Sequence, residues 1–172
     1  MRLARITDSD FSPTNIPQYL EKVSRYSARG ILMDENNRVC LLYLAETGFY
    51  KLPGGGIEGN ETKEQAFLRE IREETGYHAV VVSALGTLEE HKYRNNFLQV
   101  SHCFLAQRVG SMQPPMLTAH ELSVGVTQQW MTYRTAQRLL RRALLSCDDY
   151  GMRFMLLRDC RILESAVDYF IS

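Results

Sequence analysis

The chain has 172 residues, of which 45% are hydrophobic and 23% charged, and 20 basic side chains balance 20 acidic ones. This length and apolar content suit one folded domain with its own core, and the zero net charge gives no electrostatic case for a nucleic acid or an anionic membrane as partner. The first residues contain no apolar segment of signal-peptide length and no later stretch is long enough to span a bilayer, so we expect a cytoplasmic protein.

The first part of the chain has the signals of β-structure. Residues 1–24 have a mixed composition and are interpreted as a lead-in without an assigned element. Two apolar runs follow, 26–34 and 39–45, and the polar turn ENNR between them predicts a β-hairpin. A short strand is expected at 49–52, where the chain reaches Pro53 and three consecutive glycines. We therefore expect β-structure that ends in a glycine loop.

The segment after the glycines is predicted to be a helix over 63–75. Thr62 can cap its beginning, and Gln65 stands at the position that completes a capping box. Gly76 suits the left-handed conformation in which helices commonly end. Both ends of this helix are therefore marked in the sequence.

The next part of the chain is again predicted to be β-structure. The runs 78–93 and 96–109 are rich in β-branched and apolar residues and flank the turn residues RNN, which indicates a second hairpin. A loop over 110–125 and a short strand around Trp130 are expected next.

Two helical segments complete the chain. Thr132 can cap a helix that continues to about Leu145 with apolar residues at helical spacing. Its other face carries an arginine stripe, which we interpret as solvated, made of Arg134, Arg138, Arg141 and Arg142. The last segment, 151–169, has a wide apolar face and is expected to be a covering helix or part of the contact in a possible homodimer.

Strands and helices follow one another irregularly, and two hairpins interrupt any repeated strand–helix unit. This order disfavours a doubly wound parallel sheet and predicts an α/β (α+β) fold with a mixed sheet and helices on both faces. We divide the chain into a lead-in (1–24), a main domain (25–146) and a C-terminal helix packed on the same domain (147–172).

Three glutamates share one side of the helix predicted over 63–75. Glu70, Glu73 and Glu74 stand at positions i, i+3 and i+4. Because neighbouring like charges repel and partial burial adds to the cost, we expect a cation among them. Oxygen ligands favour a hard ion, Mg²⁺ first and Mn²⁺ or Ca²⁺ next. Composition alone leaves open the alternative of an acidic surface helix that follows a long glycine turn.

The cysteines give no sign of a zinc site. They are far apart and form no CxxC or CxxH pair, standing at Cys40, Cys103, Cys147 and Cys160. We therefore expect reduced thiols packed in the interior.

The spacing around the glutamates resembles the Nudix box of the Nudix hydrolase family, G-x5-E-x7-R-E-U-x-E-E-x-G-U, in which U is aliphatic. The residues that match are Gly55, Glu61, Arg69, Glu70, Ile71, Glu73, Glu74 and Gly76. Tyr77 occupies the last aliphatic position, and Asn60 stands where many relatives have glycine. The similarity extends over about residues 26 to 146, and it implies an α/β/α sandwich around a mixed sheet.

The resemblance also implies a reaction and residue roles. The reaction is hydrolysis of a nucleoside diphosphate linked to another group X, by attack of water on phosphorus with Mg²⁺ or Mn²⁺. The implied metal ligands are three carboxylates and one backbone carbonyl, those of Glu70, Glu73, Glu74 and Gly54. The supporting residues would be Gly55, Glu61 and Arg69. Glu70 is the first candidate for the base and Glu121, from the loop before Trp130, is the second.

Several alternatives stay open at this point. The expected substrate is a small nucleotide or nucleotide sugar, and no substrate-binding residue is assigned, because aromatic residues in strands more often belong to the core. A catalytically silent Nudix-fold sensor of a nucleotide metabolite is the main alternative, although intact carboxylates are costly to keep without a metal. A protein-interaction domain that uses the arginine stripe is a third. Glu89 and Glu90 are interpreted as strand-end charges that face solvent.

Overall fold

The computed structural model describes residues 1–12 and 14–170. In this part of the chain one mixed sheet contains eight strands, in the order β1-β6-β7-β2-β3-β4, with β5 paired to β2 and β8 paired to β3. The strands are β1 (Arg2–Thr7), β2 (Arg25–Met33), β3 (Arg38–Leu44), β4 (Phe49–Lys51), β5 (Gly54–Gly56), β6 (His78–Lys92), β7 (Phe97–Val109) and β8 (Val126–Thr132). The α-helices are α1 (Lys63–Thr75), α2 (Ala119–Ser123), α3 (Tyr133–Ser146) and α4 (Tyr150–Ser165).

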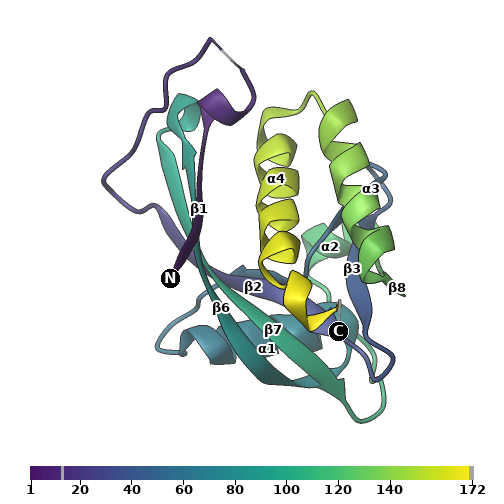
Figure 1. The fold of residues 1–172 in the computed structure, drawn as a ribbon. Helices are drawn as coiled ribbons and strands as arrows, with labels where there is room; N and C mark the ends of the chain where they lie inside the picture. Colours follow the sequence, from purple (N-terminus) through teal and green to yellow (C-terminus); the bar gives the residue numbers. More distant parts are fainter. Residues whose placement is uncertain (13, 171–172) are drawn as a thin grey trace.

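The helices cover both faces of the sheet, which confirms the predicted α/β/α arrangement. Helix α1 lies on one face, and α3 and α4 lie side by side on the other (Figure 1). Strand β2 is buried between the two layers, because Ala28 and Leu32 face α1 whereas Ile31 faces the α3 and α4 layer. The apolar run of this central strand is thus explained by burial on both of its faces.

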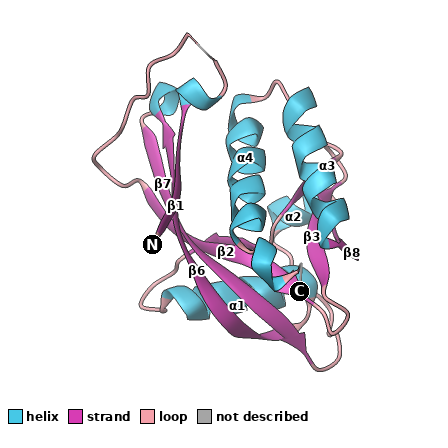
Figure 2. Cartoon of the chain, viewed as in Figure 1, coloured by secondary structure: helices cyan, strands magenta, loops and turns pink. Residues whose placement is uncertain are grey.

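Both predicted hairpins are present. Strands β2 and β3 pair antiparallel next to their turn, and β6 and β7 form a long curved hairpin (Figure 2). The short strand predicted around Trp130 is β8, which pairs antiparallel with β3. The second predicted helix is α3, and the hydroxyl of Thr132 accepts a hydrogen bond from the Thr135 N–H at 3.3 Å, as the capping pattern predicted.

Helix α1 has the predicted ends. Gln65 N–H donates to the Thr62 hydroxyl at 3.1 Å, and Thr62 N–H donates to the Gln65 side chain at 2.8 Å, which completes the capping box. Gly76 ends the helix with a φ of 74°, and a Cβ added there would lie 1.8 Å from the carbonyl oxygen of Gln113. This position therefore needs glycine for both its conformation and its space.

Three short elements were not predicted. Residues Arg2–Thr7 of the lead-in form β1, which pairs in parallel with β6 about eighty residues later, so no local pattern indicates it. The three glycines are not a loop but the strand β5, which pairs antiparallel with β2. The loop expected over 110–125 contains α2, whose capping box joins Thr118 and Glu121 and could have been recognised from the spacing T-x-x-E.

The C-terminal helix covers the sheet of its own chain. Helix α4 ends at Ser165, a few residues earlier than predicted, and a short 3₁₀ turn over Val167–Tyr169 follows it. Its apolar face is buried, and the ring of Phe170 stacks on Tyr133 of α3 at 4.6 Å. All four cysteines are free and buried, as predicted. None of the helices in residues 1–12 and 14–170 has the length and apolar character needed to cross a membrane.

Candidate functional site

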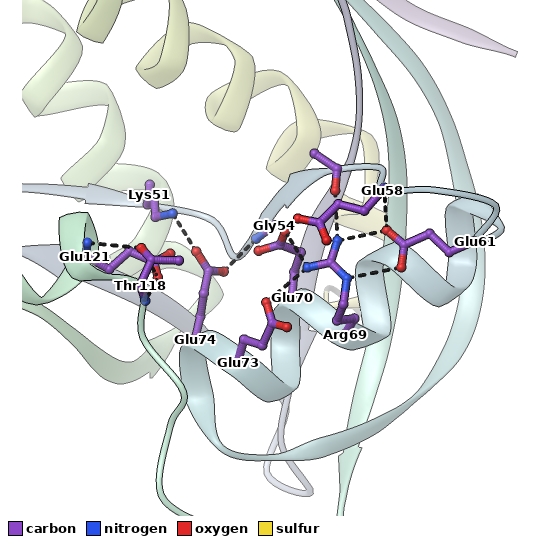
Figure 3. Close-up of polar contacts among 11 residues, drawn as sticks. Lys51, Gly54, Glu58, Glu61, Arg69, Glu70, Glu73, Glu74, Thr118 and Glu121 are labelled. Atoms are coloured by element: carbon purple, nitrogen blue, oxygen red, sulfur yellow. Dashed lines mark hydrogen bonds and ion pairs between the residues drawn. The ribbon is translucent and has the colours of Figure 1, made fainter.

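The glycine strand and helix α1 meet at Glu74. Its carboxylate accepts the N–H of Gly54 at 2.8 Å through Oε2 and contacts Lys51 Nζ at 2.6 Å through Oε1 (Figure 3). Glu74 is 3% exposed. Burial raises the pKa of Glu74 to about 7, although Lys51 and the Gly54 N–H oppose the shift. This carboxylate therefore already has a cation and an amide as partners.

Arg69 joins the other acids of the box. Its Nη1 donates to Glu70 and to Glu73, both at 3.0 Å. Its Nε and Nη2 form a two-point contact with Glu61 at 3.1 and 2.8 Å, and Nη2 also donates to the carbonyl of Gly56 at 2.9 Å. The hydrogen bonds from Arg69 lower the pKa of Glu61 below its ordinary value. One guanidinium thus connects the loop before α1 with two carboxylates on the helix.

Gly55 makes room for Glu70. A Cβ added to Gly55 would lie 2.3 Å from Glu70 Oε1, so the carboxylate occupies space that any other residue would fill. Burial raises the pKa of Glu70, and Arg69 partly offsets that shift. A carboxylate with a raised pKa held against a glycine strand is a chemically suitable proton acceptor.

Glu121 lies near this site, on the side of Glu74. It stands on α2, where its Oε2 accepts the N–H and the hydroxyl of Thr118 at 2.8 and 2.9 Å (Figure 3). Burial would raise the pKa of Glu121, but the two bonds from Thr118 and the charge of Lys51 lower it below the ordinary value. The side chain of Glu121 therefore closes the capping box of its own helix and remains ionised.

Each predicted acid of the box contacts a cation from the protein itself. Arg69 and Lys51 hold these carboxylates as they stand, and within residues 1–12 and 14–170 no three His, Cys, Asp or Glu side chains surround a common point that could hold a metal ion. The donors are nevertheless carboxylate and backbone oxygens, which suit a hard divalent ion and not zinc. A divalent ion that takes the place of Lys51 beside Glu74 is chemically compatible with this set, with Arg69 still bound to Glu61.

Two residues differ from the expectations, one at the site and one under helix α4. Lys51 was not predicted, because a lone lysine before LPGGG carries no distinctive pattern; the structure identifies it as the partner of Glu74. The prediction that Glu90 faces solvent is wrong: Glu90 is 0% exposed and pairs with Arg158 of α4 at 3.4 Å. Helix α4 covers this end of β6, which explains the burial.

A cavity of about 890 Å³ opens beside the N-terminal end of α1. It is lined by Tyr26, Ile57, Glu61, Thr62, Lys63, Glu64, His102 and Phe104. The rings of Tyr26 and His102 are nearly parallel, with centroids 6.3 Å apart. Glu61 both lines the cavity and contacts Arg69, so it is the residue that the cavity shares with the carboxylate site.

Comparisons with known proteins identify relatives that are similar to part of this chain. An 8-oxo-dGTP diphosphatase of Proteus vulgaris is 34% identical over 86 residues, which cover 48% of this chain and 76% of that protein. An ADP-ribose pyrophosphatase of Methanocaldococcus jannaschii is 40% identical over 58 residues, which cover 32% of this chain and only 34% of that protein.

Solved structures share the fold at low sequence identity. A NUDIX hydrolase from Nitrosomonas europaea superposes with a TM-score of 0.60 at 16% identity, covering 86% of this chain and 88% of its own.

The family model described as NUDIX domain matches residues 23–146 of this chain. Together with the box geometry, this match shows that the chain belongs to the Nudix family, whose relatives named here are hydrolases acting on acid anhydrides.

Proposed function

We propose that the protein is a Mg²⁺-dependent pyrophosphohydrolase that cleaves the diphosphate of a nucleoside diphosphate linked to another group X. The observation that carries the proposal is the contact of Arg69 with Glu61, Glu70 and Glu73 beside a glycine strand. A purely structural acidic helix has no need to place three partly buried carboxylates around one arginine, because desolvation of the charges is costly.

The proposed ligands of the ion are the carboxylates of Glu70, Glu73 and Glu74 and the carbonyl of Gly54. Mg²⁺, or Mn²⁺ in its place, would stabilise the negative charge of the phosphate oxygens and lower the pKa of a bound water. Lys51 would then be free to neutralise phosphate, because the ion replaces its contact with Glu74, whereas Arg69 would stay bound to Glu61 and orient the carboxylates. Gly55 keeps the space that the Glu70 carboxylate occupies.

Glu70 is the proposed base, and Glu121 is the second candidate. Water forms a new O–P bond while the bridging P–O bond breaks, and the proton of the water passes to the carboxylate, giving a nucleoside monophosphate and the phosphate of X. The raised pKa of Glu70 favours proton uptake, whereas the lowered pKa of Glu121 disfavours it.

The substrate class is a small nucleotide. The names of the two curated relatives, 8-oxo-dGTP diphosphatase and ADP-ribose pyrophosphatase, support a substrate with a phosphoric anhydride attached to a nucleoside. The substrates in these two names differ in the group that is attached to the diphosphate. The first panel should therefore include oxidised and ordinary nucleoside triphosphates, ADP-ribose, nucleotide sugars and dinucleotides.

The proposal is tested by phosphate and nucleotide release from that panel with Mg²⁺. The variants are Glu70→Gln, Glu121→Gln and the pair Glu73→Gln with Glu74→Gln; the control is Glu64→Gln, an exposed acid at the start of the same helix. We expect Glu70→Gln to lower kcat by about 100-fold or more, and Glu64→Gln to leave it nearly unchanged. Equal activity of the pair variant and the parent protein would contradict the proposed metal site.

A nucleotide sensor without turnover is the alternative function. It predicts that a nucleotide of the panel raises the thermal unfolding temperature of the parent protein while no product forms. The complete set of box carboxylates supports the hydrolase instead, because a binding module gains nothing from retaining a costly cluster of like charges.

A further inference from the structure

Helix α4 lies outside the residues that match the family, yet it contacts the chain directly before the glycine strand β5. Its Asp159 is 0% exposed, and Oδ2 accepts the backbone N–H of Leu52 at 2.8 Å. Leu52 immediately precedes Pro53 and Gly54, so the bond lies within two residues of the proposed metal-binding carbonyl.

Two buried carboxylates hold this segment from opposite layers. The Leu52 N–H donates to Asp159 of α4, and the Gly54 N–H donates to Glu74 of α1, each at 2.8 Å. Pro53 has no N–H, and its carbonyl accepts the N–H of Gly30 in β2 at 3.1 Å. Every N–H donor from 52 to 54 thus ends on a buried carboxylate, which fixes the peptide planes on both sides of Pro53 immediately before Gly54.

The Asp159 carboxylate belongs to a buried charged cluster. Its Oδ1 accepts Arg158 Nε at 2.8 Å, and Arg158 also pairs with Glu90 at 3.4 Å. Arg29 is buried beside them, and Lys92 pairs with Glu90 at 3.4 Å, so the cluster contains three cations and two acids. Replacement of such a cluster by apolar residues commonly leaves stability unchanged or raises it. Stability alone therefore does not explain why a carboxylate points at the Leu52 N–H.

We propose that Asp159 is a positioning residue for the hydrolysis, which fixes the segment from Leu52 to Gly54 against Glu74. The proposal rests on the proposed function for its catalytic consequence. The contact itself is independent of that function and can be measured separately.

The test compares Asp159→Asn with Glu164→Gln, which makes the same change from carboxylate to amide on the same helix but contacts only Arg141 and Arg161 in its ion pairs. An asparagine has a single side-chain oxygen, so it places an NH₂ group against either the Leu52 N–H or Arg158 Nε, where Asp159 has an acceptor for each. We expect the Leu52 and Gly54 amides of Asp159→Asn to exchange with solvent faster by about 10-fold or more, with core amides unchanged. The amides of Glu164→Gln should match the parent protein.

The second readout is kcat and KM for a nucleotide of the panel that the parent protein hydrolyses. Asp159→Asn should lower kcat by about 10-fold or more with KM within about threefold, because the reacting groups lose alignment while binding is kept. The proposal is overturned if the amide exchange rates and the kcat of Asp159→Asn both lie within about twofold of those of Glu164→Gln. It is also overturned if the amides of Asp159→Asn exchange faster but its kcat is unchanged.

A charge-balanced variant covers the case in which Asp159→Asn does not fold. Arg158→Gln combined with Asp159→Asn removes one charge of each sign, so the net charge of the cluster is unchanged, and the same exchange and kinetic results are expected. If the parent protein hydrolyses nothing in the panel, the proposed function fails. The amide exchange then still decides whether Asp159 holds the segment.

Discussion

Arg69 is the residue on which the geometry of the site depends most. Its planar guanidinium contacts three carboxylates and the carbonyl of Gly56 at the same time. A lysine has one ammonium on a flexible stem and cannot reproduce a two-point contact together with separate bonds to other groups. The arginine is therefore required for its shape as well as for its charge.

Arg69→Lys should lower kcat/KM by about 10- to 100-fold while the protein stays folded, because the carboxylates lose the donor that orients them. The measurement is steady-state hydrolysis at saturating Mg²⁺, with circular dichroism as a check of folding. Arg72→Lys, an exposed change on the same helix, is the control. Equal losses in both variants would contradict a special role of Arg69.

Asp34 organises the turn of the first hairpin, and its contribution depends on pH. Its carboxylate accepts the N–H groups of Asn36 and Arg38 and the guanidinium of Arg38. Burial would raise the pKa of Asp34, but these donors lower it below its ordinary value. The ionised form thus stabilises the fold above the unfolded-state pKa of about 3.9, and this stabilisation is lost as the pH falls through the lower folded-state value.

Asp34→Asn should therefore destabilise the fold by about 1–3 kcal/mol at about pH 7 and by less at about pH 3, where the carboxyl of the unfolded parent chain is already mostly protonated. Urea unfolding at both pH values measures the difference. Glu46→Gln, which changes an exposed acid in the turn between β3 and β4, is the control. If the free energies of unfolding of Asp34→Asn and the parent protein differ by the same amount at the two pH values, the ionised form of Asp34 does not make the pH-dependent contribution that is predicted.

At the scale of elements, α1 is the part of the site that is specified locally. Its capping box, its glycine stop and the spacing of its glutamates all lie within 62–76, so the helix and its acidic face could be predicted from sequence. The partners of that face could not be predicted. Lys51, and Asp159 behind the glycine strand, meet α1 and β5 only through sheet pairing and helix packing.

The same distinction explains the elements that were missed. β1 depends on a parallel partner far along the chain, and no turn or periodicity announces it. The glycine strand β5 was interpreted as a loop because glycine is rare in strands, yet a Cβ at Gly54 would lie 2.3 Å from Arg29 Cβ of the neighbouring strand. Close approach of two backbones overrides intrinsic strand preference here.

Thr62→Ala should destabilise the protein by about 1 kcal/mol, because the first turn of α1 loses the side-chain acceptor for the Gln65 N–H. Thr62→Ser keeps the hydroxyl and should retain most of the stability. Thermal unfolding of the two variants measures the difference. Equal unfolding temperatures for Thr62→Ala and Thr62→Ser would show that the cap contributes little to the fold.

At the scale of the whole molecule, α4 is an integral layer of the fold. It lies beside α3 on the face of the sheet opposite α1 (Figure 1). Phe154, Leu156, Ile162 and Leu163 are each 0% exposed in this layer. Helix α4 and the elements of the main domain therefore share one core.

A chain that ends at Ser146 should fail to fold cooperatively. Loss of α4 uncovers the sheet and removes four fully buried side chains, worth about 2 kcal/mol each, or about 8 kcal/mol together. That sum is comparable to the whole stability of a typical domain, about 5–15 kcal/mol. Thermal unfolding followed by circular dichroism and the dispersion of amide NMR signals are the measurements, and a synthetic peptide of 147–172 added in trans should restore part of the fold. A cooperative transition of the shortened chain near that of the full chain would show instead that 1–146 folds alone, and Asp159 would then act on a segment that is already formed without it.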